Sequence, residues 1–187
     1  MSGLLISDYF WMVFAAVWVI WALRTKRVRS REDIGQRLSH RPLTIAGFWL
    51  LLFPFLVPLP GWFQKEIIPS WLKGTGILLS AIGIGFAIWA RIYLGGNWSS
   101  SVTVKVEHQL IRSGPYRWVR HPIYTGMVLA ALGTALELGE VRGLIAVPLI
   151  YLGFKIKSKI EERMMRRTFG AQYDDYSAMT GGIVPRI

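Results

Sequence analysis

The sequence contains no cysteine, which excludes disulfide bonds and thiolate catalysis. Acidic residues are scarce as well, with 11 Asp and Glu against 22 Lys and Arg. The three histidines lack the spacing of a metal site, so no metal is expected. The chain also has neither the G-x-x-x-x-G-K-[ST] nor the G-x-G-x-x-G motif. These absences argue against a thiol enzyme, a metalloenzyme and a soluble nucleotide-binding domain.

Apolar and basic residues are abundant. Hydrophobic residues are 52% of the chain, the mean hydropathy is +0.37, and the net charge is +11. This combination is typical of an integral membrane protein with a basic cytoplasmic face. Nucleic-acid binding is the other interpretation of excess positive charge, but it would leave the hydrophobic runs without a purpose. A cleavable signal peptide is not expected, because the first apolar run is too long and its charges follow it.

Apolar runs approach or reach membrane-spanning length at five places, the last two near the lower limit. They cover residues 6–23, 43–59, 71–94, 122–138 and 141–156. Pro54 and Pro58 are expected to bend or end the second run. Only Gly139 and Glu140 separate the last two runs, which predicts a tight helical hairpin. The sequence therefore predicts an all-α membrane protein with about five transmembrane helices, forming one domain over residues 1–187.

The distribution of Lys and Arg predicts the orientation. Basic residues concentrate after the first run, after the third run and in the C-terminal tail. Five crossings with the N-terminus outside place all three regions in the cytoplasm. The polar loop at 95–121 and a charged, helix-prone segment at 157–167 then share one membrane face. Two segments far apart in the chain are thus expected to form one site.

The segment 107–126 is polar, basic and aromatic, although apolar runs flank it. Its candidate binding or reacting residues are His108, Gln109, Arg112, Ser113, Tyr116, Arg117, Trp118, Arg120, His121 and Tyr124. Arg120 and His121 suit a carboxylate or phosphate, and Glu161 or Glu162 suits an ammonium or a ribose diol. The aromatic residues suit a flat ring or a cation. The residue types alone leave open a cofactor with adenine, ribose and a zwitterionic tail, or a phospholipid headgroup.

Two ordered motifs occupy the second half of the chain. The first comprises His108-Gln109-Leu110-Ile111, Gly114-Pro115-Tyr116 and Arg120-His121-Pro122-Ile123-Tyr124-x-Gly126. The second comprises Glu161-Glu162, Phe169-Gly170 and Tyr173-x-x-Tyr176. Together they resemble the signature of the integral-membrane methyltransferases, which include isoprenylcysteine carboxyl methyltransferase and the phospholipid N-methyltransferases. The resemblance covers residues 95–185.

The resemblance implies S-adenosylmethionine as cofactor and a membrane-embedded helical fold. Residues 1–94 would be the N-terminal spans, and residues 95–187 the catalytic part. The implied cofactor-binding residues are His108, Gln109, Leu110, Ile111, Tyr116, His121, Pro122, Ile123, Tyr124 and Glu161. Arg120 and Glu162 are the catalytic candidates, and Arg120 is expected to orient the acceptor or the cofactor tail. A carboxylate acceptor needs no general base, whereas an amine does, with Glu161, Glu162 or His121 as candidates.

Two departures bear on the methyl acceptor. Lys157 stands where the prenylcysteine enzymes tend to have Arg, and Met179 stands where they carry another Arg. Lysine does not replace the bidentate grip of arginine on a carboxylate. The acceptor expected is therefore a prenylcysteine-like carboxylate or a lipid amine that enters from the bilayer, and methylation at oxygen, nitrogen or carbon stays open. The alternatives are an NADPH-dependent membrane sterol or lipid reductase, which shares the R-H-P-x-Y motif, and a non-enzymatic lipid-binding membrane protein.

Overall fold

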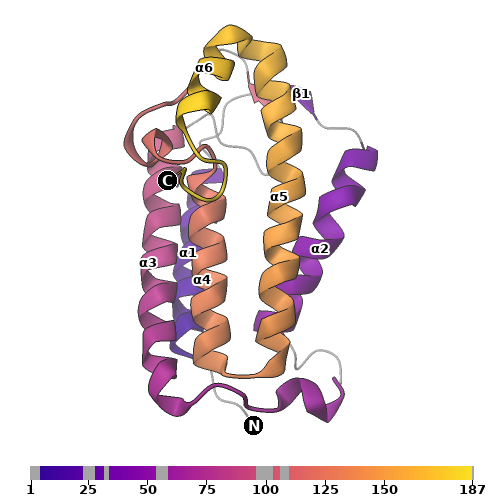
Figure 1. Cartoon of the computed structure of the whole chain (residues 1–187), viewed down its shortest axis with the longest axis vertical. Coiled ribbons are helices and arrows are strands. Elements are labelled where there is room, and N and C mark those ends of the chain that lie inside the picture. The colour runs from indigo at the N-terminus through magenta and orange to yellow at the C-terminus, as the bar shows by residue number, and fades with distance from the viewer. Residues whose placement is uncertain are drawn as a thin grey trace.

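The computed structural model describes residues 5–22, 28–31, 34–53, 59–95, 103–105 and 110–186. Within these ranges the chain forms a bundle of long helices, with a short helix at one end (Figure 1). The α-helices are α1 (Ile6–Ala22), α2 (Ile34–Leu52), α3 (Ser70–Leu94), α4 (Pro122–Leu138), α5 (Val141–Phe169) and α6 (Ala171–Met179). Two 3-10 turns, η2 (Gly61–Gln64) and η4 (Gly114–Arg117), lie in connections. Strands β1 (Val28–Arg31) and β2 (Thr103–Lys105) pair antiparallel.

Each predicted apolar run forms a helix, which confirms the helical fold apart from the small β1–β2 ribbon. Helix α4 has the predicted bounds, and α1 and α3 each differ by one residue at one end. The prediction for the second run is wrong at its start, because α2 begins earlier, at Ile34. The helix ends at Leu52, two residues before Pro54, which agrees with a proline that ends the run. Polar and basic residues continue this helix beyond its apolar part, and Pro42 lies inside it. Pro54 and Pro58 lie outside the described residues.

Helix α5 joins two segments that the sequence analysis treats separately. It continues for 29 residues, from the apolar run through the charged segment, without a break. At 1.5 Å per residue it is about 43 Å long. The hydrocarbon layer is about 30 Å thick, so several turns of α5 extend beyond it. Glu161 and Glu162 therefore lie in the charged second half of a helix that is longer than the hydrocarbon layer is thick.

Among the described helices, α3, with 25 residues, is the one that is long and apolar enough to cross a membrane on its own. Helices α1 and α4 are also apolar but are shorter. The core is built from two helix pairs, α3 with α4 and α2 with α5, and α1 lies against α3 and α4. Figure 1 shows α3, α4 and α5 running along the long axis, with α6 across one end.

Small residues bring α3 and α4 into backbone contact. A Cβ added to Gly83 would lie 2.4 Å from the backbone nitrogen of Ala130, and one added to Gly76 would lie 2.5 Å from the Gly133 carbonyl oxygen. The Ser80 hydroxyl donates to the Ala130 carbonyl across the same interface, at 3.1 Å. Such close approach is a common way to associate helices in lipid, where water exclusion does not drive packing. The pair therefore holds the start of α4 in a fixed position.

At the end of the bundle away from α6, hydrogen bonds join neighbouring segments. The buried Glu137 carboxylate accepts the backbone N–H groups of Ile6 and Ser7, at 2.8 and 3.0 Å, and so caps the start of α1. The Ile67 N–H donates to the Gly139 carbonyl, at 2.8 Å, and holds the α4–α5 turn. Helix α1 thus begins beside the last turn of α4, at the end opposite to the start of α4.

The α3–α4 interface predicts opposite effects for two neighbouring glycines of one helix. Gly83→Ala should lower the stability by about 1–3 kcal/mol, because the added methyl group meets backbone atoms that cannot move alone. Gly85→Ala is the matched control, since nothing lies within 4 Å of its added Cβ. It should be neutral or stabilising by up to about 1 kcal/mol, through helix propensity. Thermal unfolding in detergent measures both, and equal midpoints would contradict the packing described.

Candidate active site

His121 lies where the polar loop meets α4. It precedes Pro122, which occupies the first turn of α4, where proline is well accommodated. The backbone on either side is fixed by the C-terminal strap, defined here as residues 177–183. The N–H groups of Arg120 and His121 donate to the carbonyls of Gly181 and Gly182, at 2.9 and 3.2 Å. The imidazole is therefore presented at the polar end of α4.

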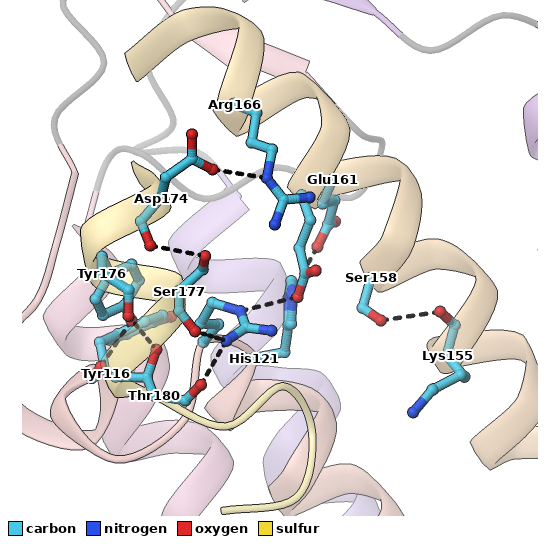
Figure 2. A network of polar contacts seen from close by, with 12 residues as sticks. Tyr116, His121, Lys155, Ser158, Glu161, Arg166, Asp174, Tyr176, Ser177 and Thr180 are labelled. Carbon is cyan, nitrogen blue, oxygen red and sulfur yellow. Dashed lines mark hydrogen bonds and ion pairs between the residues drawn. The ribbon is translucent and has the colours of Figure 1, made fainter. Parts of the chain in front are cut away.

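Two carboxylates of α5 hold the imidazole between them. His121 Nδ1 lies 3.3 Å from Glu161 Oε2, and Nε2 lies 3.1 Å from Glu162 Oε1 (Figure 2). The side chains of His121, Glu161 and Glu162 are only 9%, 21% and 16% exposed. The loop and the charged end of α5, 41 residues apart at His121 and Glu162, thus meet at one end of the bundle.

This geometry sets the protonation state of His121. An ionised carboxylate only accepts hydrogen bonds, so both ring nitrogens must carry a proton to satisfy both contacts. Burial alone would lower the pKa of His121, because it disfavours a charged ring. The hydrogen bonds to Glu161 and Glu162 and their negative charges outweigh burial and raise the pKa above its ordinary value. The two carboxylate contacts and the raised pKa therefore favour the imidazolium form of His121.

The two glutamates are correspondingly ionised. Burial opposes ionisation of Glu162, but hydrogen bonds from His121 and Arg120 lower its pKa to about 2. Burial also opposes ionisation of Glu161, and the His121 hydrogen bond and the Lys157 charge lower its pKa below the ordinary value. The cluster is thus an ion-paired network, in which both carboxylates are weak bases.

Tyr124 lies one turn after His121 and completes the Glu161 contacts. Its hydroxyl donates to Glu161 Oε1 at 2.6 Å. Its ring is stacked between His121 and Phe154, with centroids 5.5 and 4.6 Å away and interplanar angles of 6° and 7°. Lys157 Nζ lies 5.3 Å from the centroid of the same ring. Both faces of Tyr124 are occupied by protein, so its hydroxyl is its polar contribution to the site.

Sequence reasoning missed Phe154, because it lies in an apolar run and belongs to no motif. The signal that could have found it is its position seven residues before Glu161, which puts both on the same face of one helix. Phe154 is buried and is 5% exposed. Its ring stacks against the ring of Tyr124.

Arg120 directs its guanidinium toward other parts of the protein. Nε donates to Glu162 Oε1 at 2.9 Å, and Nη1 donates to the carbonyls of Ser177, at 3.0 Å, and Thr180. These contacts join α5 to the end of α6 and the strap. Arg120 therefore fixes Glu162 in place, in addition to any contact with a ligand.

The strap is held to the loop and α4 by further hydrogen bonds. The Tyr176 hydroxyl donates to the Tyr116 carbonyl at 2.6 Å, and the Thr125 hydroxyl donates to the Ile183 carbonyl. Burial raises the pKa of Tyr176 to about 12 and also raises the pKa of Tyr116. Both tyrosines are neutral, and Tyr173 is buried beside Tyr176.

The remaining predicted residues occupy different places. Tyr116 and Ile123 are buried and pack with Ala90, and Ile111 lies against this cluster. Pro122 is fully buried at the start of α4, and Leu110 is partly exposed on the loop. His108 and Gln109 lie outside the described residues. Across the described ranges, no group of three or more His, Asp or Glu side chains could hold a metal ion.

Raising the pH should loosen the ion-paired cluster. Because the pKa of His121 is raised, its ionic contribution is complete below about pH 6.5 and is lost as the pH rises through the raised pKa. Glu162, with a pKa of about 2, stays ionised throughout that range. We expect wild type to be more thermally stable than His121→Gln in detergent, and this difference to shrink on the alkaline side. A difference that stays constant from about pH 6 to about pH 10 would contradict the imidazolium.

Arg120→Lys should release the strap while keeping a positive charge near Glu162. Lysine lacks the guanidinium fork that reaches Glu162 and two carbonyls together. Loss of charge-assisted hydrogen bonds worth about 1.5–3 kcal/mol should speed hydrogen exchange of the Gly181 amide by about 10- to 100-fold. Arg117→Lys is the control, since Arg117 is exposed in η4. Unchanged exchange in Arg120→Lys would show that the strap does not depend on the guanidinium.

The matching family and two relatives of this chain are named methyltransferases. Residues 72–172 match the family described as phospholipid methyltransferase. The protein-S-isoprenylcysteine O-methyltransferase of Tribolium castaneum is 32% identical over 156 residues, which are 80% of this chain and 54% of the relative. The enzyme of the same name from Mus musculus is 30% identical over 110 residues, 57% of this chain and 39% of the relative. The chain thus matches about half of these relatives' length, or less.

One solved structure shares the fold. It is the eukaryotic intramembrane Ras methyltransferase ICMT, with a TM-score of 0.54 and 24% sequence identity. The likeness covers 85% of this chain and 55% of that chain. This chain therefore shares the fold of the matched part of that structure. Because the family match covers more than half of its residues and includes α4 and most of the site, this chain belongs to the phospholipid methyltransferase family.

Proposed function

We propose that the protein transfers a methyl group from S-adenosylmethionine to a lipophilic acceptor at the cytoplasmic membrane face. The observation that carries the proposal is the imidazolium of His121, held between Glu161 and Glu162 at the polar end of α4 and α5. Relatives of the chain are named protein-S-isoprenylcysteine O-methyltransferases, which supports the same reaction class. The cluster combines buried charge of both signs, as a zwitterionic cofactor requires.

The carboxylates of the cluster can accept further hydrogen bonds from such a cofactor. Each carboxylate oxygen can accept two hydrogen bonds. Each Glu161 oxygen has one protein partner, and Glu162 Oε2 has no partner among the described residues. These lone pairs suit the ammonium group or the ribose hydroxyls of S-adenosylmethionine. The positive charge of His121 would attract the cofactor carboxylate without a direct hydrogen bond, since both ring nitrogens already contact glutamates.

S-adenosylmethionine supplies an electrophilic methyl group when it is bound. The residues of the chain would act by alignment, since an in-line displacement depends on the relative position of the reactants. Burial of the cluster would also keep water away from the nucleophile. Arg120 and the strap would act through Glu162, as positioning elements, because the guanidinium contacts α5 and the strap.

The protonation states favour a carboxylate acceptor, such as that of a prenylcysteine, over an amine. An amine must lose a proton when it is methylated, whereas a carboxylate needs no general base. His121 is already protonated, and the lowered pKa values of Glu161 and Glu162 make them poor bases. Lys157 lies one turn before Glu161 and would attract the acceptor carboxylate as a point charge rather than as a bidentate fork.

The orientation follows from charge. The three basic regions of the sequence suit the cytoplasmic side, which would place the start of α1 outside and the His121 cluster inside. The acceptor would then enter sideways from the bilayer, between helices, while the cofactor would enter from the cytosol.

Binding of labelled S-adenosylmethionine to the purified protein tests the cofactor. We expect Glu161→Gln and Glu162→Gln to weaken binding by about 10- to 100-fold, the range of one charge-assisted hydrogen bond. Glu66→Gln is the control, because Glu66 is exposed and pairs with Lys73 at the opposite end of the bundle. Binding that is unaffected by both site variants, or a preference for NADPH, would overturn the proposal.

Methyl transfer to defined acceptors tests the substrate class. We expect labelled methyl groups to appear on farnesylcysteine analogues with a free carboxylate, as a base-labile ester. The analogue with its carboxylate already amidated should be inert. Transfer to fractionated phospholipid amines instead would retain the methyl transfer but reject the carboxylate acceptor.

A further inference from the structure

The outward side of α5 changes character along its length. Residues three or four positions apart lie on the same side of a helix, and the exposed residues of α5 recur at this interval. In the half next to the α4–α5 turn, the exposed residues are apolar: Leu144, Pro148 and Leu152. In the half that carries the site, the row continues with four basic residues: Lys155, Lys159, Arg163 and Arg167. Arg166 and Thr168 are also exposed there, and Arg166 pairs with Asp174. The change occurs within one turn.

The depth of these residues matches a bilayer surface. Helix α5 begins at Val141, and a hydrocarbon layer takes about 20 helical residues to cross. The layer therefore ends near Lys159 or Glu162. Lys159 and Arg163 lie at headgroup level, and Arg167 is about 12 Å beyond Lys159 along the helix. Lys155 lies one turn deeper, where its long stem can carry the ammonium to the surface.

Within the part of the chain that the structure describes, this basic row has no acidic partner. Among the described residues, no carboxylate lies within ion-pair distance of Lys159, Arg163 or Arg167. Glu161 and Glu162, the acids of the same helix segment, face His121 instead. Strand β2 lies beside α5, and neither β2 (TVK) nor its partner β1 (VRSR) contains an acidic residue. Like charges four residues apart destabilise a helix, so a partner of opposite sign would stabilise this part of α5.

We propose that Lys159, Arg163 and Arg167 form a binding surface for anionic phospholipids of the leaflet that contains the active site. Guanidinium groups grip phosphate through paired hydrogen bonds, and lysine does so as a point charge. The apolar part of the same row begins at Leu152, about 10 Å from Lys159 along the helix, and gives the acyl chains a surface below the headgroup. A lipid matches both parts of the row, whereas an acidic polypeptide matches the basic part alone.

The full chain, purified in dodecyl maltoside, provides the test. Dioctanoyl phosphatidylglycerol and dioctanoyl phosphatidylcholine are titrated separately, and the thermal midpoint gives an apparent affinity for each. Each basic residue near an anionic headgroup contributes roughly fivefold in affinity. We expect wild type to prefer phosphatidylglycerol by roughly a hundredfold at low salt, and much less in about 1 M NaCl.

Three variants decide the assignment. The triple glutamine variant of Lys159, Arg163 and Arg167 should bind both lipids equally, and each single glutamine variant should lose roughly fivefold. The matched control exchanges the residues without changing charge, as K159R, R163K and R167K, and should keep the preference. A triple glutamine variant or a full set of single variants that retains the wild-type preference would overturn the proposal. An equal rise in midpoint with inorganic phosphate alone would also overturn it.

Discussion

The imidazolium of His121 between Glu161 and Glu162 is the interaction on which the rest of the site depends. Buried ions are costly unless each is paired and hydrogen-bonded, and removal of one partner leaves an uncompensated charge. The loop before α4 must therefore lie against the end of α5. Tyr124 donates a further hydrogen bond to Glu161, and Arg120 donates one to Glu162.

The packing of the helices fixes the position of His121 relative to the two glutamates. Helix α4 is held against α3 at backbone distance, through Gly83 and Gly76, so the position of its first residue is fixed. Helix α5 is continuous from the α4–α5 turn to Phe169, so its polar end moves with its membrane part. The two glutamates reach the imidazole because α5 continues past the start of α4 at this end of the bundle (Figure 1).

Much of this could be predicted from the sequence. Apolar runs predict helices because only internally hydrogen-bonded segments cross lipid, and α1, α3 and α4 follow the runs closely. The ends of α2 and α5 could not be predicted in this way, since a helix continues into polar residues where packing supports it. The motifs placed His121, Tyr124 and the glutamates together. They did not reveal Phe154, or the carbonyls of Ser177 and Thr180 that engage Arg120, because apolar packing and backbone acceptors leave no mark in residue types.

The C-terminal strap is bound to the site almost entirely through its main chain. The carbonyls of Ser177, Thr180, Gly181, Gly182 and Ile183 all accept hydrogen bonds from the loop or from α4. Every residue type supplies a carbonyl, so the exposed side chains at Ala178 and Met179 can change during evolution without loosening the attachment. Gly181 cannot, since any Cβ would overlap the Val184 carbonyl oxygen at 2.0 Å, and Ile183 is buried in the hydrophobic core. Aligned homologues should therefore vary at the two exposed positions, yet keep glycine at 181 and an apolar residue at 183.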